Sequence, residues 1–371
     1  MFYYALFFLF SLGQIGRISI YNQQVNFYLY EILLFSLFLY LFNKFKFKPL
    51  SQNKKKWLLY FPIVLFLSFL ITFNRYSQIG NLVSFLYFLR TSFYFIFIVY
   101  LNFFIKKQKD LKELINYGLI LFITLTIVTS FLQYFLYPNL RNLVYLGWDP
   151  HIFRIFGVFL DTSIASAIFG LILLYLILNY KKFIFSTFSK VLLIIAYSFL
   201  GLLTYSRGFY ISIFITLIYY LLLKKKIKYL MIILFIFVSA LFFLPKPFGE
   251  GVNLLRTYSI TSRIADYKQG FSIWKENPVF GIGYGHLKEF RESIAQLPSH
   301  SLSAFQSSFM TILATAGLLG LVVFFLALKN LWFYSKSAKY YVLFLSIFSL
   351  MDNILLHPFI LFLLLFLVND S

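Results

Sequence analysis

The sequence predicts an all-α, polytopic membrane protein, and two observations carry the prediction. Of the 371 residues, 61% are apolar and only 12% are charged, a balance that no soluble domain tolerates. Several separate apolar runs approach the roughly 20 residues that an α-helix needs to cross a bilayer. A membrane β-barrel would instead show alternating strands of about ten residues. We therefore expect about twelve transmembrane helices.

Each apolar run is assigned one span, in chain order. The predicted spans cover residues 2–13, 27–43, 57–73, 82–105, 113–136, 163–180, 190–205, 209–223, 229–244, 306–328, 339–351 and 354–368. The first run lacks a basic leader and a small-residue cleavage site, so it is expected to remain as a helix. Residues 1–244 thus hold nine spans and an outer loop at 137–162. Residues 245–305 form a large outer loop, and residues 306–371 hold the last three spans.

The lysines indicate how the chain is oriented. Of the 24 lysines, 20 lie in alternate loops, at residues 44–56, 106–112, 181–190, 224–228 and 329–339. Cytoplasmic loops of membrane proteins are enriched in Lys and Arg, so this side is predicted to be cytoplasmic, with both termini on it. The same enrichment accounts for the net charge of +21 without nucleic acid as a partner, because no soluble basic domain is present to bind it.

The nine arginines follow another distribution. Eight fall in outer loops or at outer helix ends: Arg17, Arg75, Arg141, Arg154, Arg207, Arg256, Arg263 and Arg291. Guanidinium makes planar two-point contacts with phosphate and carboxylate, whereas lysine acts as a point charge. The outer face is therefore predicted to bind an anionic ligand, with pairing to outer acids as the alternative for part of the set. Arg90 lies inside the fourth span and is a candidate by default, unless it pairs with Glu31 or a carbonyl group.

The outer loop at 245–305 is expected to be partly helical. Apolar residues recur at helical spacing from Thr261 to Trp274, and Asn277-Pro278 then stops the helix, which would lie as a lid over the membrane-embedded helices. The glycine run from Gly281 to Gly285 resembles a dinucleotide fingerprint in its letters only, because no buried strand precedes it. A tight turn is the better interpretation.

Three ordered pieces carry a resemblance to a known family. They are Arg154-Ile155-Phe156-Gly157-Val158-Phe159 with Asp161; Thr204-Tyr205-Ser206-Arg207-Gly208; and Arg263, Asn277 to Gly285 and a helix ending at Ala316 to Gly320. Within about residues 150–330 this set resembles the O-antigen ligase/polymerase family of bacterial envelope glycosyltransferases. The resemblance implies a fold similar to the GT-C type.

The resemblance also implies an activity. A glycan would pass from an undecaprenyl-pyrophosphate carrier to a growing glycan or to lipid A-core, at the periplasmic face of the bacterial inner membrane. Neither a metal nor another cofactor would be needed, and the partners would be these substrates and the membrane lipids. Ligase-like members carry a histidine about eleven residues before the glycine that Gly317 matches. Gln306 stands there, with His300 as the nearest histidine, which favours a polymerase over a ligase.

Candidate site residues follow from the resemblance and from the charge distribution. The predicted catalytic residues are Arg207, Arg263 and His300, and the predicted substrate-binding residues are Arg154, Arg256, Arg90 and Asp266. Arg207 and Arg263 match family arginines that the resemblance implicates in function. Arg207 would stabilise the negative charge on the leaving pyrophosphate. A snorkelling helix-end role is the alternative for Arg207, and a loop ion pair for Arg256.

His300 has the residue type of a general base, with Asp266 or Glu289 as alternatives and a loop hydrogen bond as its structural interpretation. The four histidines are scattered and do not form a metal site. The rival function is a lipid-linked oligosaccharide flippase or transporter. Transporters usually show internal repeats and midplane polar groups, whereas this chain gathers its polar residues at the outer face. We therefore predict a surface-polysaccharide polymerase, with O-antigen ligase as the alternative.

Overall fold

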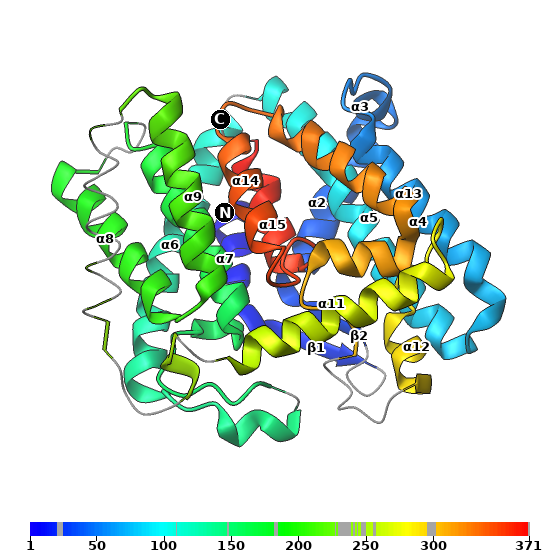
Figure 1. Cartoon of the computed structure of the whole chain (residues 1–371). Coiled ribbons are helices and arrows are strands. Elements are labelled where there is room, and N and C mark those ends of the chain that lie inside the picture. Colours follow the sequence, from blue (N-terminus) through cyan, green and yellow to red (C-terminus); the bar gives the residue numbers. More distant parts are fainter. Residues whose placement is uncertain are drawn as a thin grey trace.

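The structure is a computed structural model that describes residues 1–20, 25–108, 110–146, 148–181, 185–226, 250–254, 257–294 and 302–369, together with residues 228, 239, 242, 244 and 245. Over these residues the chain is a bundle of helices with one short hairpin, as Figure 1 shows. Helix α3 and the C terminus lie at one end of the bundle. The hairpin, α11 and α12 lie toward the other end.

The first half of the chain supplies six helices of the described part and the hairpin. Their bounds are α1 Phe2–Ser11, β1 Arg17–Ile20, β2 Val25–Tyr28, α2 Leu29–Phe45, α3 Lys48–Ser51, α4 Trp57–Thr72, α5 Gln78–Lys107 and α6 Asp110–Leu136, with 3-10 turns at Gly13–Gly16, Phe73–Arg75 and Arg141–Leu146. The antiparallel strands pair Arg17 with Tyr28 and Ile20 with Val25. The sequence does not predict this hairpin, because four-residue strands offer too few positions for an alternating pattern.

The rest of the chain supplies the helices that carry the site. Their bounds are α7 Thr162–Leu178, α8 Thr187–Leu203, α9 Arg207–Leu223, α11 Tyr258–Glu276, α12 Leu287–Ile294, α13 Ser308–Trp332, α14 Ala338–Phe348 and α15 Pro358–Leu367, with 3-10 turns at Gly157–Phe159 and Glu250–Val252. Helix α7 is buried along nearly its whole length. It therefore forms a central element against which α8, α9, α14 and α15 pack.

Four of the described helices are long and apolar enough to cross a membrane. They are Trp57–Arg75, Gln78–Lys107, Asp110–Leu136 and Ser308–Trp332. Six further apolar helices are shorter, with 10–17 residues each: α1, α7, α8, α9, α14 and α15. These lengths support a multi-pass helical membrane protein. The count of twelve spans stays a prediction, and most of the predicted span at 229–244 lies outside the described residues.

Helix α13 breaks at Gly317, whose φ of 67° and ψ of −168° leave the helical region. The loop after α11 fills the break: Ile282 donates its backbone N–H to the Ala314 carbonyl (3.0 Å), and Leu318 donates to the Pro278 carbonyl (2.8 Å). Backbone groups freed by the break are thus satisfied by the loop. After the break the helix resumes and continues to Trp332, four residues beyond the end of the span predicted at 306–328.

The glycine run packs its backbone against this break. Gly281, Gly283 and Gly285 all have positive φ, and a Cβ on Gly281 would lie 2.5 Å from the Ala314 carbonyl oxygen. Only glycine allows both the turn and the close approach. The expected tight turn is therefore confirmed, and its role is to fill a broken membrane helix.

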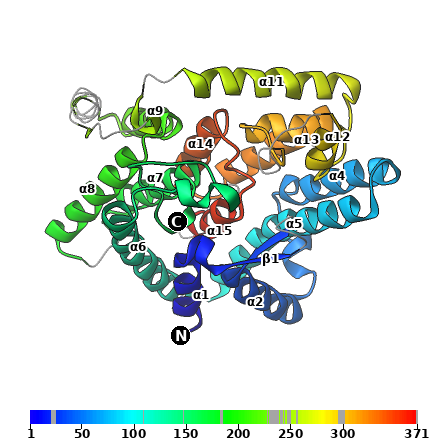
Figure 2. The same cartoon turned by 90° about the horizontal axis from the view of Figure 1, so that it is seen from below.

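Helix α11 confirms the helix expected from Thr261 to Trp274 and ends where predicted, with Asn277 as its C-cap. It lies along one edge of the bundle beside α9, α14 and α13, as Figure 2 shows. The Tyr267 hydroxyl donates to the Leu350 carbonyl oxygen at 2.5 Å. This contact fixes α11 across the turn between α14 and α15.

Candidate functional site

The segment that leads into α7 holds the Thr204 to Gly208 segment in place. The guanidinium Nε of Arg154 donates to the Thr204 carbonyl (2.8 Å), and Ile155 donates its N–H to the Leu203 carbonyl (3.0 Å). Gln133 from α6 in turn donates to the Arg154 carbonyl at 3.3 Å. Arg154 is only 7% exposed. The structure thus gives Arg154 a positioning contact, and its predicted substrate-binding role stays a prediction.

The Thr204 to Gly208 segment is a tight turn that starts α9. Tyr205 has a φ of 50°, in the left-handed region that L-residues rarely adopt. The Ser206 hydroxyl then caps the helix by accepting from the Phe209 N–H at 3.4 Å. A Cβ on Gly208 would lie 2.5 Å from the Phe348 ring, so glycine lets α9 approach α14. These features place Arg207 in the first turn of α9, where the helix dipole also favours an anion.

Arg207 and Arg263 come from separate parts of the chain and act on one another. Arg207 donates from a terminal nitrogen to the Leu254 carbonyl at 3.4 Å. Arg263, on α11, donates from Nε to the Met351 carbonyl at 2.7 Å. Burial lowers the pKa of Arg207, and the positive charge of Arg263 lowers it further. Two cations held together in this way attract an anionic ligand, which relieves their repulsion.

A row of acidic and hydroxyl groups continues from Arg263. Its guanidinium lies 3.9 Å from the carboxylate of Asp352, in the turn between α14 and α15. The Ser163 hydroxyl donates to that same carboxylate at 2.5 Å. The backbone N–H groups of Ser163 and Ile164 donate to Oδ1 of Asp161, at 2.7 and 3.0 Å. Ser163 therefore bridges the two carboxyl groups at the start of α7.

The environment of both carboxyl groups raises their pKa and so favours their protonated forms. Burial raises the pKa of Asp161 to about 7, and the negative charge of Asp352 adds to the rise. Burial also raises the pKa of Asp352, while the Ser163 hydroxyl and Arg263 act in the opposite direction. The Asp352 side chain still keeps 28% of its surface exposed, so the row remains open to a ligand.

Asp266 and Gln306 lie in a second polar cluster. One carboxylate oxygen of Asp266 lies 3.3 Å from a terminal nitrogen of Arg291, and the other accepts from the Gln306 N–H at 2.9 Å. The Gln306 side-chain amide donates to the Ser262 hydroxyl at 3.0 Å. The cluster ties α11 to α12 and to the start of α13. A substrate-binding role of Asp266 stays a prediction.

Arg90 has the partner that the sequence left as the alternative. Two of its nitrogens donate to the two carboxylate oxygens of Glu31, at 2.8 and 2.5 Å. The Tyr94 hydroxyl donates to Glu31 at 2.9 Å, and the guanidinium lies over the Tyr28 ring. Arg90 is therefore held in a structural ion pair between α5 and α2. Two other candidates, Arg256 and His300, lie outside the described residues.

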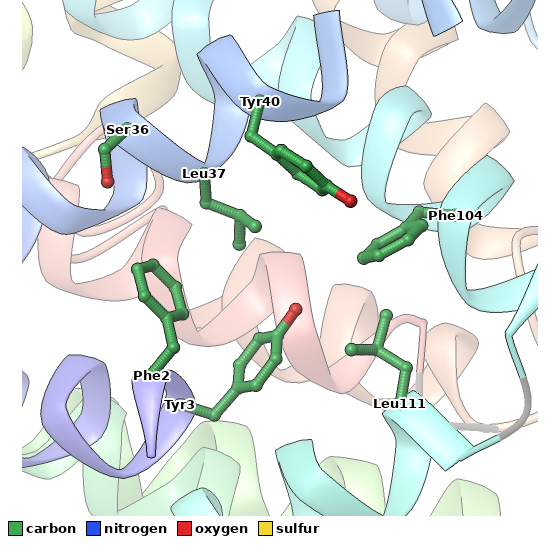
Figure 3. A pocket seen from close by; sticks show the side chains of 7 residues that line it. All are labelled: Phe2, Tyr3, Ser36, Leu37, Tyr40, Phe104 and Leu111. Atoms are coloured by element: carbon green, nitrogen blue, oxygen red, sulfur yellow. The ribbon is translucent and has the colours of Figure 1, made fainter. Parts of the chain in front are cut away.

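An apolar pocket lies among α1, α2, α5 and α6, as Figure 3 shows. Its volume is about 410 Å³ and its lining consists of Phe2, Tyr3, Ser36, Leu37, Tyr40, Phe104 and Leu111. A pocket without a charged lining residue does not suit a pyrophosphate. Among the described residues, no group of three or more His, Cys, Asp or Glu side chains could hold a metal ion.

The sequence analysis missed Asp352 and Ser163 as members of the site. Asp352 carried a signal, since it is an acid in the short turn between two apolar runs, 339–351 and 354–368. An acid in a predicted outer loop is a reasonable partner for arginines in the other predicted outer loops. Ser163 carried none, because serine is common in the first turn of helices.

Comparison with known proteins places the arginines within a family domain. Residues 191–325 match the model of a family described as O-antigen ligase, a region that contains Arg207, Arg263 and Gln306 but neither Asp161 nor Asp352. No curated protein matches the chain. Residues 191–325 are therefore similar to the O-antigen ligase family, in agreement with the O-antigen ligase/polymerase resemblance that the ordered motifs indicate.

Proposed function

We propose that the protein is an inner-membrane glycosyltransferase that polymerises glycan repeat units carried on undecaprenyl pyrophosphate. The reaction would take place at the periplasmic face, in the row formed by Arg207, Arg263 and Asp352. O-antigen ligase activity, with lipid A-core as the acceptor, is the second candidate, favoured by the description of the matched family.

The observation that carries the proposal is the approach of Arg207 to Arg263. One lies in the first turn of α9 and the other on α11, and each is oriented by a carbonyl oxygen, of Leu254 and of Met351. Burial lowers the pKa of Arg207, and the positive charge of Arg263 adds to this effect. The two guanidinium groups would each bind one phosphate of a pyrophosphate, a group that arginine recognises with paired hydrogen bonds.

The chemistry requires such a pair. An acceptor hydroxyl oxygen forms a bond to the anomeric carbon of the donor glycan, and the bond from that carbon to the carrier pyrophosphate breaks. The electron pair leaves with the pyrophosphate, and the hydroxyl proton passes to a base. Cations already in position stabilise the developing charge without reorganisation, a contribution of about 3–4 kcal/mol per group in comparable sites.

The test is a gel of surface glycolipid with a parallel assay of lipid-linked intermediates. A deletion strain would receive wild-type protein, Arg207→Ala, Arg207→Lys or Arg141→Ala at equal expression. Arg141 is the matched control, because it is an exposed arginine that contacts Asn139 outside the row. We expect Arg207→Ala to behave as the deletion, Arg207→Lys to recover part of the product, and Arg141→Ala to match wild type.

The deletion phenotype separates the candidates. Surface product limited to one repeat unit would support the polymerase. Unmodified core, with long polymer retained on the carrier lipid, would support the ligase. Wild-type product from Arg207→Ala would contradict the pyrophosphate role and favour the flippase.

A further inference from the structure

The first observation concerns the connection between two acids that lie far apart in the chain. Ser163 donates its backbone N–H to Asp161 at 2.7 Å and its hydroxyl to Asp352 at 2.5 Å. Ser163 thus contacts both carboxyl groups, and its hydroxyl reaches an acid that lies 189 positions later in the chain.

The second observation concerns Oδ2 of Asp161, the carboxylate oxygen that takes no part in capping α7. Its Oδ1 accepts both backbone hydrogen bonds of the α7 cap. Its Oδ2 accepts none from the residues that the structure describes. The residue is half-buried rather than sealed. Asp161 therefore has one oxygen fixed by the helix and one available to a hydroxyl group.

The third observation concerns the order of charges along the row. Contacts run from Arg263 to Asp352 and on through Ser163 to Asp161. The charge of Arg263 also acts on Arg207. A glycosyl transfer needs cations at the leaving group and a proton acceptor on the side of the incoming hydroxyl. The row has both kinds of group. Gln306, which stands where the family histidine would be, offers only an amide.

We propose that Asp161 is the residue that accepts the proton of the attacking hydroxyl, and that Asp352 is a positioning residue that orients Arg263 and Ser163. This inference rests on the proposed function. In the step, the acceptor oxygen bonds to the anomeric carbon while its proton moves to Oδ2 of Asp161. The carbon–oxygen bond to the carrier breaks, and both of its electrons leave with the pyrophosphate.

The acidity of the groups is suited to this role. Burial and the charges of Asp352 and Asp149 raise the pKa of Asp161 to about 7, against the two backbone hydrogen bonds that lower it. On the neighbouring Asp352, the positive charge of Arg263 acts to lower the pKa, against the effect of burial. A base works best when its pKa lies near the working pH, because it can then both take and release the proton.

The test uses purified full-length protein in lipid nanodiscs, with lipid-linked repeat units extracted from the deletion strain as donor. Asp161→Asn keeps an N-cap residue for α7 but removes the proton acceptor. Glu292→Gln is the matched control, an outer acid that pairs with Lys288 on the surface of α12. Turnover is measured from pH 5 to 9, and binding of undecaprenyl pyrophosphate is measured separately.

We expect wild-type turnover to fall on the acid side with a midpoint near 7. Asp161→Asn should lose about 100- to 10,000-fold in turnover together with this acid limb, while it still binds undecaprenyl pyrophosphate. Asp161→Glu should restore part of the rate. Glu292→Gln should match wild type throughout.

Other results would overturn the inference. Wild-type turnover from Asp161→Asn would do so, as would loss of its carrier binding, which would make the residue structural. An acid limb that disappears in His300→Gln but persists in Asp161→Asn would assign the proton to the histidine. If the wild-type protein released no polymer at any pH, the proposed function itself would fail, and this inference with it.

Discussion

Arg154 donates from Nε to the main-chain carbonyl oxygen of Thr204, 2.8 Å away and 50 residues later in the chain. The contact joins the segment before α7 to the turn that presents Arg207. Because Asp161 follows in the same segment, a single buried guanidinium fixes the arginine of the site relative to its carboxyl groups.

The first prediction concerns this contact. Arg154→Ala should reduce the free energy of unfolding by about 1.5–3 kcal/mol, since hydrogen bonds from charged groups contribute that much. It should also lower turnover, because Arg207 loses its fixed position. Thermal unfolding in detergent and the polymer assay measure the two effects. A variant with normal turnover would show that the turn holds its shape without Arg154.

The second prediction concerns the broken helix. In Gly317→Ala the new Cβ would lie 2.2 Å from the Val279 carbonyl oxygen, at a φ of 67°. The strain should cost more than the roughly 1–2 kcal/mol of a left-handed residue alone. Gly16→Ala is the control, because its Cβ would have no neighbour closer than 3.5 Å. Equal melting temperatures for both variants would contradict the role given to Gly317.

The third prediction concerns the ion pair between Arg90 and Glu31. Arg90→Ala leaves a carboxylate buried without its partner, so we expect a loss of about 3–5 kcal/mol. The double variant Arg90→Met, Glu31→Gln should recover most of it. Thermal unfolding of the wild-type protein, the single variant and the double variant measures the two changes in stability. If the single variant were stable but inactive, the predicted substrate-binding role of Arg90 would regain support.

The fourth prediction concerns the stability of the protein as a function of pH. The folded protein raises the pKa of Asp161 from 3.8 to about 7, so the folded state binds its proton more tightly than the unfolded state does. The stabilisation is fully present below pH 4 and is lost as the pH rises to 7. The melting temperature of wild type relative to Asp161→Asn should therefore decrease over this range. A constant difference would show that Asp161 titrates normally.

The residues themselves indicated the class of protein and much of its outer part. Apolar runs predicted a multi-pass helical membrane protein, and α11 ends at the Asn277-Pro278 stop signal. Such features are local, since a helix depends on neighbours three and four positions away. The ordered motifs likewise predicted Arg207 and Arg263 as site residues from short segments.

The tertiary structure decided which of these residues meet. The pairing of Arg90 with Glu31, 59 residues away, was one of two alternatives that the sequence could not separate. The bridge from Asp161 through Ser163 to Asp352 left no pattern in the sequence, because it depends on how α7 packs against the turn after α14. Short-range periodicity determines helices, whereas contacts between distant segments follow from the packing of the whole bundle, and the carboxyl pair exists only there.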